Sequence, residues 1–344
     1  MSYAATYHAV RQLMPANPRR AIFYCPRSHA YFAPRGRYGR LAPTPSPLLA
    51  DAPDLDRLAA ALAGAGLRLK AWVIGCHNSD LATAHPDCAV RTALGDPLPH
   101  HLCPANPEVQ QYLETLLCDL TAGRDLDALE LESFGYGGFE HGAHHEMSGL
   151  PTDPFHSQLL SLCFCPACDP PDGLRTAVAA ELRAWLATPA WALAQRPADA
   201  AEARAAFAAA HPELEVLQAQ RKRTVRLLCV RLRQAVRAVA PQTRLIDLGG
   251  GAAGADPDLR AWADGLVTRA DPVAVTAARA TLGPQADIGA GCYPLAPRPL
   301  APEQLRAAVL ACAAAGADTF NYYNHGLMQA STWGDIAEAV AACP

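Results

Sequence analysis

The chain has 344 residues, of which 51% are apolar and 18% charged, and this composition excludes an intrinsically disordered protein. Its net charge of -4 excludes a nucleic-acid binder that depends on phosphate contacts, because such proteins are basic. No apolar run is long enough for a membrane span, and the N-terminus lacks the pattern of a signal peptide. The sequence therefore predicts a cytoplasmic protein with reduced thiols, no membrane partner and no nucleic-acid partner.

Strand-length apolar runs alternate with helix-length amphipathic segments along the chain. The predicted strands are, in order, 2–7, 21–25, 69–75, 126–132, 244–248, 265–269, 287–292 and 318–323. The predicted helices are 55–65, 107–120, 174–186, 212–239, 257–263, 272–282, 302–315 and 332–342. Eight strand–helix units predict an α/β fold consisting of one (β/α)8 TIM barrel over residues 1–344. A long insertion, at about 136–210, follows the fourth strand.

Polar and aromatic side chains follow the predicted strands at their C-terminal ends, where the active site of a TIM barrel lies. Aromatic rings can stack on the apolar faces of a sugar, and histidine and asparagine can form hydrogen bonds with its hydroxyl groups. This mixture of side chains predicts a carbohydrate substrate. The sequence is also compatible with a homo-oligomer. The predicted substrate-binding residues are Tyr7, His8, His77, Asn78, Tyr293, Tyr323, Asn324 and His325.

The fourth predicted strand carries two carboxylates, Glu130 and Glu132, which point to the same side of the strand because they are two residues apart. The intervening leucines then face the helices, so both acids point into the barrel. A buried carboxylate is costly unless it is paired or used in chemistry. Glu132 is therefore predicted to be a general acid or base with a raised pKa. The alternative for both residues, and more so for Glu130, is a salt bridge with a barrel arginine.

The insertion begins with a loop that contains Cys163, Cys165 and Cys168 in a CxCxxC pattern. Three such close thiols in a reducing compartment indicate a structural zinc site rather than a disulfide. Cys103, in the loop after the third predicted strand, is the best fourth ligand, because loops after neighbouring strands meet at one face. Cys88 or a nearby histidine is the fallback, and reduced cysteines without a metal are the alternative.

These motifs resemble the barrel of family 42 glycoside hydrolases. The shared features are Cys-Pro-x-x-Pro beginning at Cys103, an acid ending the fourth strand, and the CxCxxC pattern. The resemblance implies a retaining glycosidase in which Glu132 is the acid/base and Cys103, Cys163, Cys165 and Cys168 bind zinc. Strings such as HNSDL, LCPANPEV, LELES and NYYNHG also resemble bacterial glycosidase-like barrels along most of the chain.

The chain departs from the family pattern at the second carboxylate. The family carries Asn-Glu on strand four and a glutamate on strand seven, whereas this chain has Leu131-Glu132 and a seventh strand, DIGAGCYP, with no glutamate. The acid of that strand, Asp287, stands at its beginning. Asp271, after the sixth strand, is the preferred second catalytic carboxylate. Glu130 is a further catalytic candidate, and the remaining candidates are Asp247, Glu146 and Asp96.

Two other functions stay open. HGAHHE, from His141 to Glu146, or the strand-end histidines His8, His77 and His325, could hold the metal of a metal-dependent hydrolase or isomerase. The missing glutamate on the seventh strand is also compatible with a carbohydrate-binding barrel that has no catalytic activity.

Overall fold

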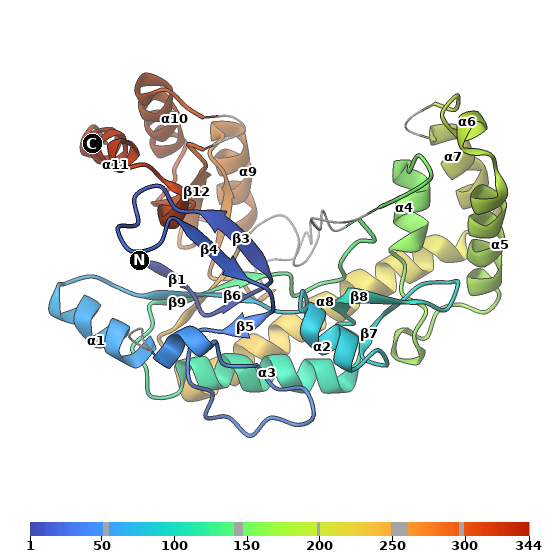
Figure 1. The fold of residues 1–344 in the computed structure, drawn as a ribbon, viewed down its shortest axis with the longest axis horizontal. Helices are drawn as coiled ribbons and strands as arrows, with labels where there is room; N and C mark the ends of the chain where they lie inside the picture. The colour runs from blue at the N-terminus through green and yellow to red at the C-terminus, as the bar shows by residue number, and fades with distance from the viewer. Residues whose placement is uncertain (51–54, 141–146, 198–199, 249–260, 296–298, 344) are drawn as a thin grey trace.

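The central element of the computed structural model is a parallel sheet that curls into a half-barrel (Figure 1). The structure describes all residues except 51–54, 141–146, 198–199, 249–260, 296–298 and 344. Within this part of the chain the sheet has seven strands in the order β1-β6-β9-β10-β11-β12-β13. Their bounds are β1 Ser2–Ala4, β6 Lys70–Ile74, β9 Ala128–Glu132, β10 Arg244–Asp247, β11 Gly265–Arg269, β12 Asp287–Cys292 and β13 Thr319–Tyr322. The predicted α/β class with a parallel sheet is confirmed.

The predicted second barrel strand is wrong. Residues 22–25 do form a strand, β4 (Ile22–Cys25), but it pairs antiparallel with β3 (Val10–Leu13) in a separate hairpin. The turn between these strands contains Pro15 and Pro18, so the chain folds back locally instead of entering the sheet. As a result β1 pairs directly with β6, and the acid-bearing β9 is the third strand of the sheet rather than the fourth.

Outside the main sheet, the described residues also form two short antiparallel strand pairs and three short 3-10 turns. β2 (Thr6–Tyr7) pairs with β5 (His29–Ala30), and β7 (Ala89–Arg91) pairs with β8 (Pro97–Leu102), both antiparallel. The predicted first strand is therefore divided into β1 and β2. Short 3-10 turns cover Pro47–Ala50, Pro166–Cys168 and His325–Leu327.

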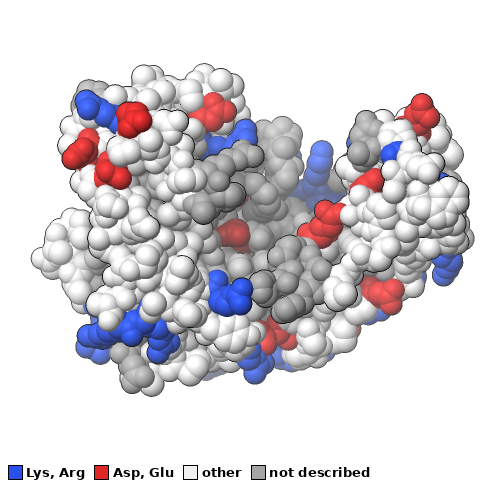
Figure 2. Space-filling model, turned by 45° about the horizontal axis from the view of Figure 1, so that its top comes forward, with Lys and Arg blue, Asp and Glu red and all other residues white. Residues whose placement is uncertain are grey.

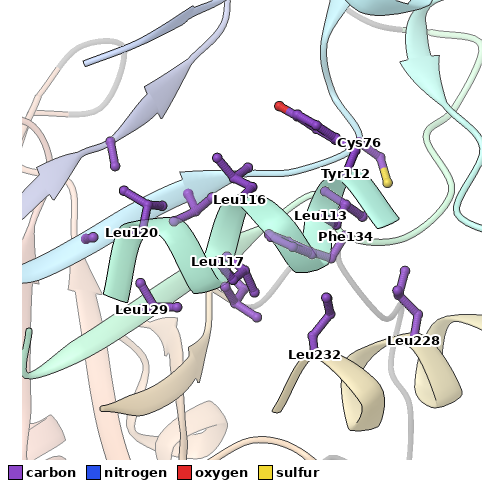
Figure 3. Packing of buried hydrophobic residues seen from close by; sticks show 14 of the residues in the cluster. Cys76, Tyr112, Leu113, Leu116, Leu117, Leu120, Leu129, Phe134, Leu228 and Leu232 are labelled. Atoms are coloured by element: carbon purple, nitrogen blue, oxygen red, sulfur yellow. The ribbon is translucent and has the colours of Figure 1, made fainter. Parts of the chain in front are cut away.

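Helices cover the outer face of the half-barrel (Figure 1). They are α1 Leu55–Gly64, α3 Pro107–Thr121, α8 Glu213–Val239, α9 Pro272–Leu282, α10 Pro302–Ala314 and α11 Ala330–Ala341, with a short α2 at Ser79–Ala84. Asn106 caps α3, accepting from the backbone N–H groups of Glu108 and Val109. Leucines of α3 recur at helical spacing and pack against Leu129 of β9 and Leu232 of α8 (Figure 3). The predicted helix over 257–263 lies mostly outside the described residues.

Between β9 and α8 the chain forms a helical arm with a core of its own. This arm comprises α4 (Pro154–Leu160), α5 (Leu174–Ala187), α6 (Ala190–Leu193) and α7 (Ala201–Ala210), and it stands apart from the half-barrel in Figure 1. Buried residues such as Phe155, Leu182 and Phe207 pack with Leu217 of the long helix α8. Among the described residues, no helix combines the length and apolarity that crossing a membrane requires.

Side chains, and no backbone ladder, connect the two edge strands β1 and β13 in the described sheet. The carboxylate of the buried Glu130 accepts hydrogen bonds from Ser2 of β1 and from Asn321 of β13, the latter at 3.2 Å. Lys70 Nζ lies 3.7 Å from Glu130 and 3.6 Å from Asp287 across the interior. We call Ser2, Lys70, Glu130, Asp287 and Asn321 the basal cluster. The alternative interpretation of Glu130 was a salt bridge with a barrel arginine, and the cation that lies beside it is a lysine.

Candidate active site

Glu132 lies at the C-terminal end of β9, half-buried. The indole Nε1–H of Trp72 donates to its carboxylate at 2.7 Å. Burial raises the pKa of Glu132 above its usual range, while the hydrogen bond from Trp72 and the charge of His8 act in the opposite direction. A raised pKa favours the protonated form of this carboxyl group, which is the form that a general acid needs.

Aromatic rings surround Glu132. Trp72 meets Tyr7 and Tyr323 edge to face, with ring centroids 5.2 Å and 5.6 Å apart. The hydroxyl groups of Tyr7 and Tyr323 are 2.8 Å apart, and the Tyr293 ring lies 5.6 Å from that of Tyr323. Burial and nearby groups, including Glu132, raise the pKa values of Tyr7 and Tyr293, so these phenols stay protonated at neutral pH. Three of the predicted substrate-binding residues are thus brought together at the predicted acid.

A row of histidines continues from this aromatic group. The imidazole of His8 stacks on His77 with ring centroids 4.7 Å apart, and His77 lies 6.4 Å from His101. His101 Nε2 is 2.9 Å from the carbonyl oxygen of Gly135. A Cβ at Gly137 would fall 2.2 Å from the His101 ring, so a glycine is required where this ring packs. The sequence did indicate His8 and His77, but it did not single out His101.

The other predicted substrate-binding residues have structural contacts. Asn78 caps α2, accepting from the backbone N–H of Leu81. Asn324 accepts from the backbone N–H of Gly326, and His325 stacks on Trp333 with ring centroids 4.8 Å apart. Within the described part of the chain, His8, His77 and His325 do not form a group that could hold a metal ion.

The candidate second carboxylates are spread over the fold. Asp271 caps α9, accepting from the backbone N–H of Val273 at 3.0 Å. Burial, together with the charge of Asp271, raises the pKa of Cys312 in α10. Glu130 belongs to the basal cluster, and Asp96 lies in the turn between β7 and β8. Glu146, with the rest of HGAHHE, lies outside the described residues.

Asp247 differs from these because it is buried without compensation. Burial raises its pKa to about 7, and its Oδ1 has no hydrogen-bond partner among the described residues. Its register partner on β9 is Leu131. Since paired residues of neighbouring strands point to the same side, Asp247 faces the helices with Leu131 and away from Glu132. No described carboxylate acts on the pKa of Glu132.

Cys103, Cys163, Cys165 and Cys168 form a compact cluster. The Cys103 sulfur is 3.5 Å from that of Cys168, 3.6 Å from that of Cys165 and 3.7 Å from that of Cys163. Four thiolates at about 2.3 Å from a tetrahedral zinc ion stand roughly 3.8 Å from one another. The cluster is therefore at metal-binding distances and compatible with a structural metal. Cys88, the fallback ligand, lies instead beside Asp87 and Glu108.

Groups around the cysteine cluster suit a negative charge. The backbone N–H of Arg91 donates to the Cys163 sulfur at 3.3 Å, and the Tyr136 hydroxyl is 3.4 Å from the Cys168 sulfur. The guanidinium of Arg221, on α8, lies 4.3 Å from the centroid of the Tyr136 ring. Since four thiolates with one zinc ion carry two net negative charges, Arg221 is well placed to offset them. Arg221 lies 53 residues beyond Cys168, and no sequence pattern connects it with the cysteines.

Figure 2 shows a hollow between the half-barrel and the helical arm, with acidic atoms exposed inside it. At the C-terminal end of β9 the arrangement combines a carboxyl group with a raised pKa, aromatic rings and imidazoles.

Solved structures with a similar fold include glycosidases. One is alpha-L-fucosidase isoenzyme 2 from Paenibacillus thiaminolyticus, at a TM-score of 0.57 and 16% identity, covering 91% of this chain and 42% of that chain. Another is beta-galactosidase from Bacillus circulans sp. alkalophilus, at a TM-score of 0.49 and 14% identity, covering 78% and 42%. The chain thus spans less than half the length of these proteins. It matches no family model, and no curated protein sequence matches it.

The likeness to the fucosidase defines the class of fold, a barrel-like α/β fold of the kind that glycosidases use. At such low identity it defines nothing finer. Membership of family 42 in particular is not established by these comparisons.

Proposed function

We propose that the protein is a glycoside hydrolase in which Glu132 is the general acid/base. The observation that carries this proposal is the position of Glu132: a half-buried carboxyl group with a raised pKa, held by Trp72 and surrounded by aromatic rings at the C-terminal end of a parallel strand. Glu132 would protonate the leaving oxygen of a glycosidic bond. Tyr7, Tyr293 and Tyr323 would contact the sugar, with His8 and His77 donating hydrogen bonds.

The second carboxylate decides between a catalytic and a binding function. Asp271 is the sequence-based candidate, and its hydrogen bond to the first turn of α9 favours a capping role for this residue. Since no described carboxylate acts on Glu132, a barrel that binds carbohydrate without cleaving it is the second candidate function. Asn78, Asn324 and His325 would then support the site through local turns rather than contact the sugar.

Glu132→Gln tests the proposal. The amide keeps the size of the side chain and an oxygen that can accept from Trp72, but it cannot donate an acidic proton. Hydrolysis of a panel of nitrophenyl glycosides is expected to fall at least a hundred-fold, with an unchanged melting temperature. Glu140→Gln, at an exposed position beyond β9, is the matched control and should keep full activity. Turnover by Glu132→Gln at the wild-type rate would exclude the proposed role, and sugar binding without turnover by the wild type would favour the binding function.

We further propose that the four-cysteine cluster binds a structural zinc ion. The sulfur spacing supports a tetrahedral site, and four protein ligands leave no open position for a catalytic water. The purified protein is expected to contain one zinc per chain by elemental analysis. Cys165→Ser should lose it and melt at a lower temperature, whereas Cys118→Ser, on α3, should retain it. Zinc retained by Cys165→Ser would favour a histidine-bound metal and a metal-dependent hydrolase.

A further inference from the structure

A small pocket lies beside Tyr7, between the β2–β5 pair and the C-terminal end of β6. Its cavity volume is about 10 Å³, room for one hydroxyl group, and the residues that matter for its chemistry are Tyr7, Ser28, His29 and His77. Tyr7 and His77 also belong to the surroundings of Glu132, through the Trp72 contact and the His8 stack. The pocket therefore adjoins the candidate active site.

Ser28 contributes a hydroxyl group that the fold leaves without a partner. The residue is 5% exposed, and its Oγ has no hydrogen-bond partner within the described part of the chain. Its backbone N–H donates to the carboxylate of Asp80 at 2.5 Å, and Asp80 also pairs with Arg27. These contacts fix the position of Ser28. A buried hydroxyl group that is held in place and unsatisfied is poised to bond to a ligand.

His29 contributes a hydrogen-bond acceptor. Its Nδ1 is 3.1 Å from the sulfur of Cys25, which itself donates to the carbonyl oxygen of Arg27 at 3.3 Å. In the tautomer that fits a thiol proton directed to that carbonyl, the imidazole carries its proton on Nδ1 and donates to the sulfur. Nε2 is then an acceptor. Burial lowers the pKa of His29, so the ring is neutral at neutral pH.

Apart from two histidines, the lining of the pocket consists of side chains that carry no charge. It contains no lysine, arginine, aspartate or glutamate among the described residues. A carboxylate, sulfate or phosphate group placed there would lose its hydration without gaining a cation. A hydroxyl group, by contrast, can donate to His29 Nε2 and exchange hydrogen bonds with Ser28 Oγ.

We infer that this pocket is a subsite that recognises one hydroxyl group of a neutral sugar bound next to Glu132, through Ser28 and His29. The inference rests on the proposed carbohydrate function and narrows its substrate class to uncharged sugars.

The test measures binding of free sugars by titration calorimetry and saturation-transfer NMR. The probes are the neutral sugars D-galactose and L-fucose and the acidic sugar D-galacturonate. Ser28→Ala should weaken binding of the preferred neutral sugar about ten-fold, the effect of one lost hydrogen bond. Thr92→Val is the matched control, because Thr92 is equally buried with an unpartnered hydroxyl but lies between β7 and β8. It should bind like the wild type.

The outcomes separate this inference from the proposed hydrolysis. Ser28-dependent binding of a neutral sugar without turnover keeps the subsite and rejects hydrolysis. If a glycoside is hydrolysed, Ser28→Ala should raise KM at an unchanged melting temperature, and an unchanged KM would reject the subsite alone. Tighter binding of D-galacturonate than of either neutral sugar, or no binding of any probe, would also overturn the inference.

Discussion

Replacing Lys70 with methionine would test whether the basal cluster holds the half-barrel together. The Lys70 side chain is 14% exposed, and those of Glu130 and Asp287 are 2% and 7% exposed. At separations near 4 Å, each attraction amounts to about 4 kcal/mol at an effective dielectric constant of 20. Removing one partner of a buried pair typically costs about 3–5 kcal/mol, because the remaining charge loses its compensation.

The two acids would respond differently to this substitution. Asp287 keeps an ion pair with Arg244 at 2.7 Å, whereas Glu130 keeps the neutral donors of Ser2 and Asn321 and a longer-range attraction to the N-terminal ammonium group. We therefore expect Lys70→Met to lower the free energy of unfolding by about 3–5 kcal/mol, mostly through Glu130.

Urea unfolding of a double-mutant cycle measures this contribution. With Glu130→Gln as the second substitution, the uncompensated charge is absent, so Lys70→Met should cost about 2–3 kcal/mol less than in the wild type. Equal costs in both backgrounds, or a cost below about 1 kcal/mol in the wild type, would refute the assigned role of Lys70.

Two predictions concern pKa values. Trp72→Phe removes a hydrogen bond that stabilises the ionised form of Glu132, so the pKa of Glu132 should rise and the basic limb of the pH–rate profile should move to higher pH. A basic limb that does not move would show that it does not report the titration of Glu132. Asp247 has a folded pKa of about 7, above its unfolded value, so its contribution to stability is lost as pH rises from about 4 to 7. Asp247→Asn should flatten that decline in urea unfolding, and an unchanged decline would contradict the reasoning.

The sequence predicted the parts of the fold that local patterns determine. The alternation of strands and amphipathic helices indicated the parallel sheet and most of its strands within a few residues. The strand at 22–25 was also recognised, but its partner was not. A short apolar strand can pair either with a strand of the barrel sheet or with its neighbour in a hairpin. Local sequence is compatible with both pairings, and only tertiary contacts decide between them.

The candidate site was predictable where chemistry and strand position coincide. Glu132 ends β9 and Tyr7 ends β2, so both lie where the sequence analysis expects the site. Asn78 and Asn324 also follow strands, yet both bind backbone N–H groups of the next turn, a competing use of short amide side chains. The Lys70 pairing and the approach of Arg221 to Tyr136 connect residues far apart in sequence and left no local signal.

The hydrogen bond between the hydroxyl groups of Tyr7 and Tyr323 joins residues that are 316 positions apart in the sequence. The hydrogen bond from Asn321 to Glu130 joins residues that are 191 positions apart. Contacts of such sequence separation form late, because a long loop must close before they contribute stability. During synthesis, the segments that carry Trp72 and Glu132 are made long before β13. The aromatic surroundings of Glu132 therefore stay incomplete until Tyr323 has been made, and any catalysis there begins only when the two edges of the sheet have met.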